Sequence, residues 1–156
     1  MWKFSYSLTI LPVLLCFFVF GCRKVTVEKN SNPQRYADSQ VVGSWMITEV
    51  QSDKPYDWDG NGTTETNVYE TWSECQKANL YQLSGTKTGT YKMSCSSTKN
   101  GTWLIENALV LVLNPDGAAP QEETIIALTS NEFRTTSVKQ PTPNNRFLIT
   151  KVWTRQ

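Results

Sequence analysis

The sequence feature that most constrains the fold is a series of short segments in which apolar and polar residues alternate. In a β-strand, this period-two alternation places the apolar side chains on one face. Trp103 and Ile105 are spaced in this way, and so are Ile126 and Leu128. Eight segments are expected to be strands: residues 41–50, 79–83, 88–95, 101–106, 108–113, 123–129, 132–138 and 146–155.

Residues typical of turns separate most of these segments, as at 84–85, 99–101, 114–117, 130–131 and 141–145. Short connections favour antiparallel neighbours, and a meander of eight strands can close into a barrel without exposed edges. The sequence therefore predicts an all-β domain at residues 41–156. Its expected form is an eight-stranded antiparallel up-and-down barrel with a long first inter-strand loop.

The long loop covers residues 55–76, which is too many for a hairpin connection. Val68, Trp72 and Cys75 lie at helical spacing, so a short helix or a lid is expected here. The loop also carries the aromatic residues Tyr56, Trp58, Tyr69 and Trp72. Aromatic residues near a barrel rim are suited to ligand capture, to protein contact or to plugging the barrel end.

The N-terminus has the pattern of a signal peptide. Lys3 precedes an apolar run of 13 residues at 8–20, which is shorter than the roughly 20 residues that span a bilayer. The following residues, Val19-Phe20-Gly21-Cys22, resemble the lipobox of bacterial lipoproteins. This resemblance implies that residues 1–21 are removed and that Cys22 carries the lipid. The alternative is an ordinary secretory signal with an incidental cysteine.

A lipid on Cys22 would make the membrane the first partner of this protein. Arg23 and Lys24 follow directly and would lie at the height of the lipid headgroups. Residues 22–40 contain few large apolar side chains and are expected to form a tether, with room for a short helix near 33–39. The expected location is the bacterial cell envelope, on the periplasm-facing side of the outer membrane.

The remaining cysteines, Cys75 and Cys95, have one pairing open to them, because Cys16 leaves with the signal. A disulfide closing a loop of this length stabilises by about 3 kcal/mol in the chain-entropy model. The alternative is two separate buried thiols.

Composition excludes several classes of function. The sequence has no histidine, which excludes a Ser-His-Asp triad and the common histidine zinc sites. Removal of residues 1–21 takes away only Lys3 among the charged residues, which leaves 14 basic and 14 acidic side chains. A chain of zero net charge has no basic field to attract nucleic acid, so no nucleic-acid partner is expected.

Gly43-Ser44-Trp45 opens the first expected strand and resembles the G-x-W signature of lipocalins. The wider pattern resembles the lipocalin-like lipoproteins of the Bacteroidetes through the Asp-rich turn at 57–62, Cys75, Cys95 and the G-T-W at 101–103. The resemblance implies that Trp45 packs at the closed end of the barrel, under Arg155 or Lys151. It also implies a binding protein, and no enzyme is expected because the sequence shows no histidine and no convergent pair of carboxylates.

The Asp-rich turn matches the first six positions of a calcium-binding loop, with Asp57, Asp59 and Asn61 as the candidate calcium ligands. The twelfth position, where a bidentate Glu is needed, holds Val68, and Glu65 and Glu70 are out of register. The alternative is a plain turn rich in Asp, Asn and Gly. No other cofactor is expected.

An eight-stranded barrel has an interior wide enough for side chains or for one small ligand. The candidate ligand-binding residues are Tyr81, Tyr91, Trp103, Leu111 and Phe133, and the alternative is that they only fill the core. The function expected is binding of a small hydrophobic molecule by a lipid-anchored envelope protein. The alternative function is a structural or protein-contact module with a filled barrel, whose protein partner the sequence does not identify.

Overall fold

The structure is a computed structural model, and it describes residues 35–93, 95 and 97–156. The expected signal peptide, Cys22 and most of the tether lie outside the described residues. The strands are β1 (Gly43–Tyr56), β2 (Glu65–Asn67), β3 (Leu80–Leu83), β4 (Thr88–Lys92), β5 (Lys99–Glu106), β6 (Val110–Pro115), β7 (Gln121–Leu128), β8 (Glu132–Thr142) and β9 (Asn145–Arg155). The short helices are α1 (Asp38–Val41), the 3₁₀ turn η1 (Val68–Thr71) and α2 (Glu74–Lys77).

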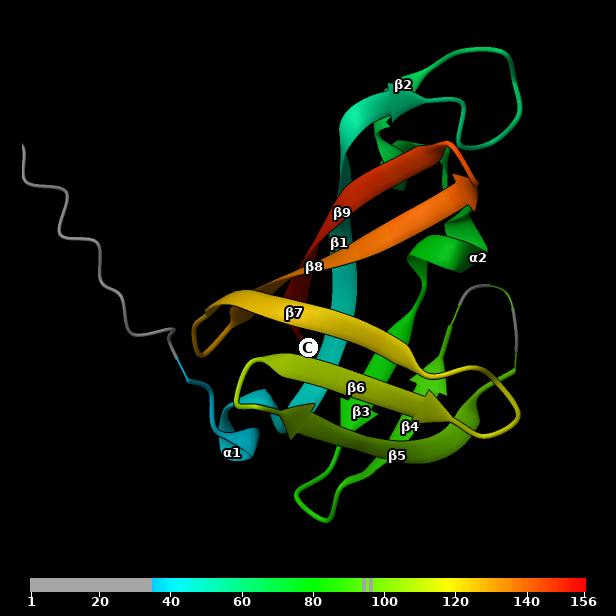
Figure 1. The fold of residues 1–156 in the computed structure, drawn as a ribbon. Coiled ribbons are helices and arrows are strands. Elements are labelled where there is room, and N and C mark those ends of the chain that lie inside the picture. The colour runs from blue at the N-terminus through cyan, green and yellow to red at the C-terminus, as the bar shows by residue number, and fades with distance from the viewer. Residues whose placement is uncertain (1–34, 94, 96) are drawn as a thin grey trace, which may run out of the picture. The chain divides into compact units, whose positions relative to one another are not determined.

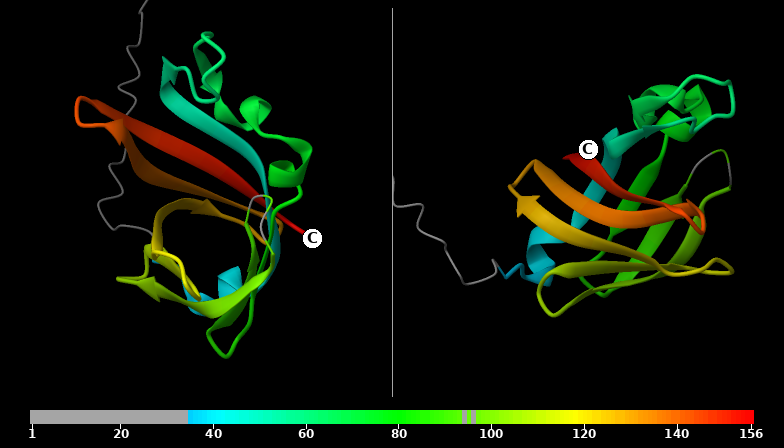
Figure 2. Two further views of the ribbon diagram at one scale, coloured as in Figure 1. Left: turned by 90° about the vertical axis from the view of Figure 1, so that its right-hand side faces the viewer. Right: turned by 45° about the horizontal axis from the view of Figure 1, so that its top comes forward.

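The sheet closes on itself. Each strand from β3 to β9 is antiparallel to its neighbour in sequence, and β1 pairs with both β3 and β9. Figures 1 and 2 show the sheet curling round until β9 lies beside β1. The predicted eight-stranded antiparallel barrel is therefore confirmed, with β2 added as a short ninth strand along the far end of β1.

Several element boundaries differ from the sequence prediction. The first strand continues beyond Val50 to Tyr56, because its far half pairs with β9 and β2. The expected helix in the long loop is divided into η1 and α2. In β7, Ile125 is 1% exposed and Ile126 is 51% exposed, so the predicted inward pairing of Ile126 with Leu128 is wrong. A bulge between Ile125 and Ala127 shifts the alternation by one residue.

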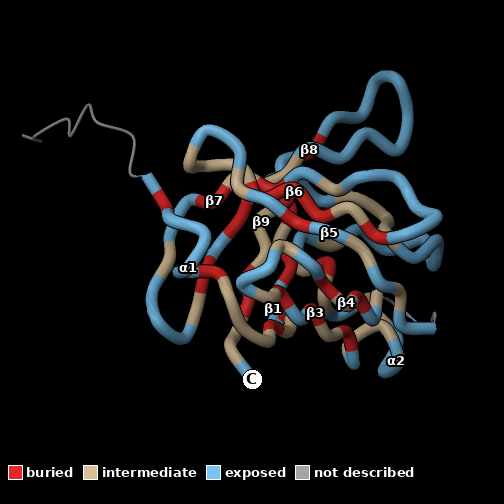
Figure 3. Tube along the Cα trace, turned by 90° about the horizontal axis from the view of Figure 1, so that it is seen from below, coloured by how far each residue is buried: buried red, intermediate tan, exposed pale blue. Residues whose placement is uncertain are grey.

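The core is built from the inward-facing residues of alternating positions, as the red segments of Figure 3 show. Its largest fully buried side chains are aromatic: Trp45, Trp103, Trp153, Tyr91 and Phe133. Phe133 stacks on Trp153 with ring centroids 5.0 Å apart and meets the edge of Trp45 at 4.7 Å. This half of the barrel is therefore filled with side chains.

One end of the barrel is closed by Trp45, as the family resemblance implies. The Arg155 guanidinium lies 4.2 Å from the centre of the Trp45 ring and donates to the carbonyl of Val42 at 2.9 Å. Gly43 makes room for it, because a Cβ there would lie 2.2 Å from Arg155 Nη1. Arg155 thus takes the covering role for which Lys151 was the other candidate.

The last residues of the expected tether also belong to this closed end. Trp45 Nε1 donates to the carbonyl of Val41, the last residue of α1, at 2.7 Å. Tyr36 is buried, and its backbone N–H donates to the carbonyl of Ala108 at 2.8 Å. Within residues 35–93, 95 and 97–156, no helix has the length and apolar character needed to cross a bilayer.

Candidate functional site

A cavity of about 400 Å³ lies in the half of the barrel away from α1 and the Trp45 closure. Its apolar wall comes from the strands and the long loop. The aliphatic lining residues are Ile47, Val50, Val68 and Ile149, and the aromatic ones are Trp58, Trp72 and Tyr81. A cavity of this size with an aromatic wall is typical of sites for small apolar molecules.

The long loop forms one wall of the cavity through Trp58 and Trp72. Trp58 is fixed by edge contacts to Tyr56 and Phe147, each with ring centroids 5.0 Å apart. Trp72 lies between η1 and α2 and contacts Tyr69 at 5.4 Å. The loop therefore covers one side of the cavity, which is the position expected of a lid.

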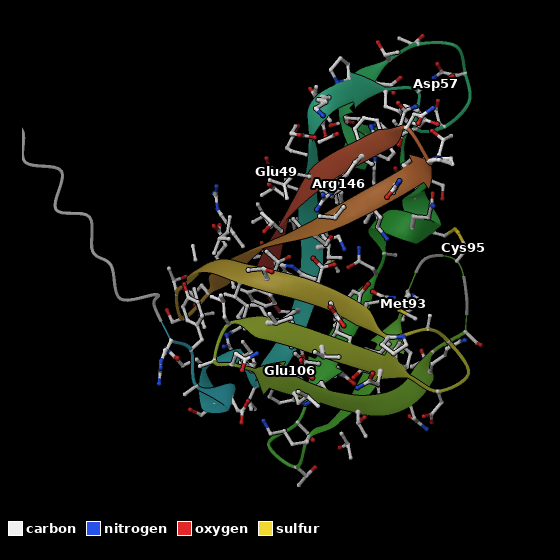
Figure 4. The ribbon with its side chains drawn as sticks, in the orientation of Figure 1. Glu49, Asp57, Met93, Cys95, Glu106 and Arg146 are labelled. Atoms are coloured by element: carbon white, nitrogen blue, oxygen red, sulfur yellow. A yellow bond between two sulfur atoms is a disulfide. The ribbon has the colours of Figure 1, made fainter. Side chains whose placement is uncertain are left out.

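The disulfide expected between Cys75 and Cys95 is present, with Cα atoms 5.1 Å apart. It joins α2 to the connection between β4 and β5, as Figure 4 shows at Cys95. Because Trp72 lies three residues before Cys75, the bond ties the lid to the barrel beside the cavity.

The cavity reaches the side of the barrel between β7 and β8. The last pair in the β7–β8 ladder at this end is Thr124 with Thr136, and beyond it the two strands diverge (Figure 1). A second hollow of about 500 Å³ lies at the divergence and shares Gln121 and Lys139 with the first cavity. We call this place the lateral opening.

A buried ion pair lies beside the lateral opening. Lys151 donates to Glu123 Oε1, and the two side chains are 12% and 3% exposed. Thr135 donates to Glu123 Oε2 at 2.9 Å, and Trp153 Nε1 donates to Thr135 at 2.9 Å. The chain of hydrogen bonds satisfies the buried carboxylate and connects the cavity wall to the aromatic core.

The phenol groups of the interior are held in their neutral form. Burial, reinforced by the nearby Glu123 charge, raises the pKa of Tyr81 well above its usual value. Burial, with a smaller contribution from Asp116, raises the pKa of Tyr91 to about 12. Tyr91 uses its proton to donate to the carbonyl of Thr102 at 2.7 Å.

The five candidate ligand-binding residues are all buried but are not brought together in one site. Tyr81 lines the cavity. The other four, Tyr91, Trp103, Leu111 and Phe133, belong to the filled half of the barrel. Sequence reasoning missed the polar cavity residues Gln121, Lys139 and Lys151, because alternation was followed only through apolar positions.

The Asp-rich turn uses its carboxylate oxygens on its own backbone. Asp57, labelled in Figure 4, accepts from the N–H of Gly60 at 2.8 Å and from that of Gly62 at 3.0 Å. Asp59 accepts from the N–H and the side-chain amide of Asn61. No three His, Cys, Asp or Glu residues converge as a metal site anywhere in the described residues. Calcium binding here stays a prediction.

A larger groove, of about 640 Å³, crosses the outer face of β1, β3, β4 and β5. Its side chains are mostly small and polar, such as Ser44, Thr90 and Asn100, which are in register across the strands. It has no aromatic wall, and we therefore place the candidate site in the smaller interior cavity.

Comparison with protein-family models agrees with the barrel. A family model described as a lipocalin-like domain matches residues 41–135. No curated protein matches the sequence. Among solved structures, the chain is similar to one titled "Odorant Binding Protein OBP1", at 11% identity and a TM-score of 0.40, over 79% of this chain and 76% of that chain.

Proposed function

Since the chain belongs to the lipocalin-like domain family, we propose that it is a lipid-anchored envelope protein that binds a small hydrophobic molecule without catalysis. The observation that carries the binding proposal is the cavity of about 400 Å³ between the lid and the barrel wall. Family members of this type are typically binding proteins. The filled half, around Trp103 and Phe133, gives the rigid base on which such a cavity rests.

The anchoring part of the proposal rests on the sequence around Cys22. A Cys22→Ser protein is expected to stay unprocessed or to fractionate away from membranes, because it lacks the acylated thiol. A processed Cys22→Ser form that still sediments with membranes would contradict the anchor. Treatment of intact cells with an external protease then tests the periplasm-facing location, in which the protein should be protected from cleavage.

The binding part is tested on the mature chain from residue 22 onward, made with Cys22→Ser so that it carries no lipid of its own. The neutral apolar dye N-phenyl-1-naphthylamine should bind with enhanced fluorescence. Trp72→Ala should weaken binding by about tenfold, since a buried aromatic contact contributes about 1–2 kcal/mol. Ile126→Ala is the matched control, because Ile126 is exposed on the outer face.

Equal dye binding by the parent protein, Trp72→Ala and Ile126→Ala would show that the dye does not bind in this cavity. No binding by the parent protein would favour the alternative of a contact module with no small ligand. Native mass spectrometry of the mature protein from its own host, searching for a co-purified small molecule, identifies the natural ligand.

A further inference from the structure

The wall of the cavity at the lateral opening is polar, whereas the opposite wall is aromatic and aliphatic. On β7, Gln121 and Glu123 share the inward face with the buried Ile125. On β8, Ser137 and Lys139 share the inward face with the buried Phe133 and Thr135. The sheet therefore points four polar side chains at the place where its ladder is interrupted.

The charges of this wall do not cancel. Glu123 is paired with Lys151, so those two charges neutralise each other. In the part of the chain that the structure describes, no carboxylate pairs with Lys139, which lines both hollows. Glu122 also borders the outer hollow, but it alternates with the two inward-facing residues of β7 and so belongs to the outer face. The interior side keeps one net positive charge.

Two buried polar atoms of residues that line these hollows have no partner among the described residues. They are the indole N–H of Trp58, whose ring lines the cavity, and the hydroxyl of Ser137, which borders the outer hollow. A buried donor without a partner costs about 1–3 kcal/mol, so such groups normally meet an ordered water or a bound group. An acceptor group of a ligand would satisfy both kinds of donor.

We propose that the cavity takes an amphipathic anion, with its apolar body against Trp72 and Tyr81 and its carboxylate at the lateral opening on Lys139. This inference rests on the proposed binding function and adds the chemical class of the ligand. Lys139 is exposed to solvent on one side, so the carboxylate sits at the mouth and the apolar chain points inward.

The test compares two ligands of equal chain length, decanoate and 1-decanol, by displacement of N-phenyl-1-naphthylamine from the mature Cys22→Ser chain. Decanoate is expected to bind about tenfold more tightly, as for a hydrogen bond to a charged group. Lys139→Met should remove this preference by lowering decanoate affinity more than decanol affinity. Lys139→Arg should retain it, and so should the control Lys92→Met, because Lys92 is exposed on β4 outside the cavity.

The outcomes separate the two proposals. Equal binding of decanoate and decanol by the parent protein overturns the anionic class and leaves the binding function intact. A preference that survives in Lys139→Met overturns the role of Lys139. Failure of the dye and both ligands to bind overturns the binding function and this inference together. Unchanged circular dichroism of Lys139→Met excludes misfolding as the cause of a lost preference.

Discussion

Replacing Glu123 by Gln is expected to destabilise the barrel strongly, because it leaves the Lys151 ammonium without its carboxylate. The Lys151 side chain is only 12% exposed and that of Glu123 only 3%, so the charge left behind would be poorly solvated. Breaking a buried ion pair by removing one member costs about 3–5 kcal/mol. For a domain of this size, that lowers the melting temperature by roughly 10 °C or more. Lys151→Met should cost a similar amount, since it leaves the Glu123 carboxylate unpaired.

The double variant Glu123→Gln/Lys151→Met distinguishes pairing from simple loss of packing. With both charges gone, the double variant should lose about 2–3 kcal/mol less than the sum of the two single losses, which is the coupling free energy of the pair. Urea unfolding followed by tryptophan fluorescence measures the free energy of unfolding of all four proteins. Glu132→Gln is the matched control, because the Glu132 and Arg134 side chains of this second ion pair are 43% and 49% exposed. The Glu132→Gln substitution should lower the free energy of unfolding by less than about 1 kcal/mol. Two results would refute this reasoning. One is a double variant whose loss of unfolding free energy equals the sum of the two single losses, and the other is a Glu123→Gln loss no larger than that of Glu132→Gln.

Three further predictions concern the closure, the lid and the phenols. Arg155→Met should lower the free energy of unfolding by about 2–3 kcal/mol, because the cation–π contact with Trp45 and the hydrogen bond to the Val42 carbonyl are lost. Urea unfolding measures this loss, and a value under about 1 kcal/mol would contradict the closing role of Arg155. Reduction of the Cys75–Cys95 bond should lower the melting temperature by about 10 °C, because its 20-residue loop contributes about 3 kcal/mol. The same melting temperature in the reduced protein, with both thiols shown to be free, would contradict this contribution. Stability should fall as pH rises from about 10 to about 12, because the folded state keeps the Tyr91 proton that the unfolded state loses at about 10. Melting temperatures measured between pH 10 and pH 12 test whether stability falls as pH rises. The melting temperature of Tyr91→Phe should decline less over this range.

Local patterns were sufficient to predict the barrel, because the spacing of residues such as Trp103 and Ile105 repeats in most of its strands. The face of a side chain follows from alternation, but its height along the barrel does not. Tyr81 and Tyr91 therefore look equivalent in the sequence, although only Tyr81 reaches the cavity. Height depends on the register between strands, which no single segment contains.

The polar wall escaped prediction for a different physical reason. The run Gln121-Glu122-Glu123 is polar on both faces, so it gives no period-two signal. Ile125 and Ile126 are both apolar, and the bulge beside them hides which one faces inward. The lateral opening arises because β8 leaves β7 to continue with β9, a three-strand arrangement that is invisible in any one strand. Functional positions at such breaks require the assembled sheet.

The β1–β9 seam also determines when the barrel can be completed. Thr48 and Thr154, 106 positions apart in the sequence, hydrogen bond across it at 2.8 Å. The hairpins from β3 to β8 need only near neighbours, whereas the seam joins strands that lie far apart in the sequence. Closing this seam is therefore expected to be the slow step of folding, since contacts of large sequence separation form late.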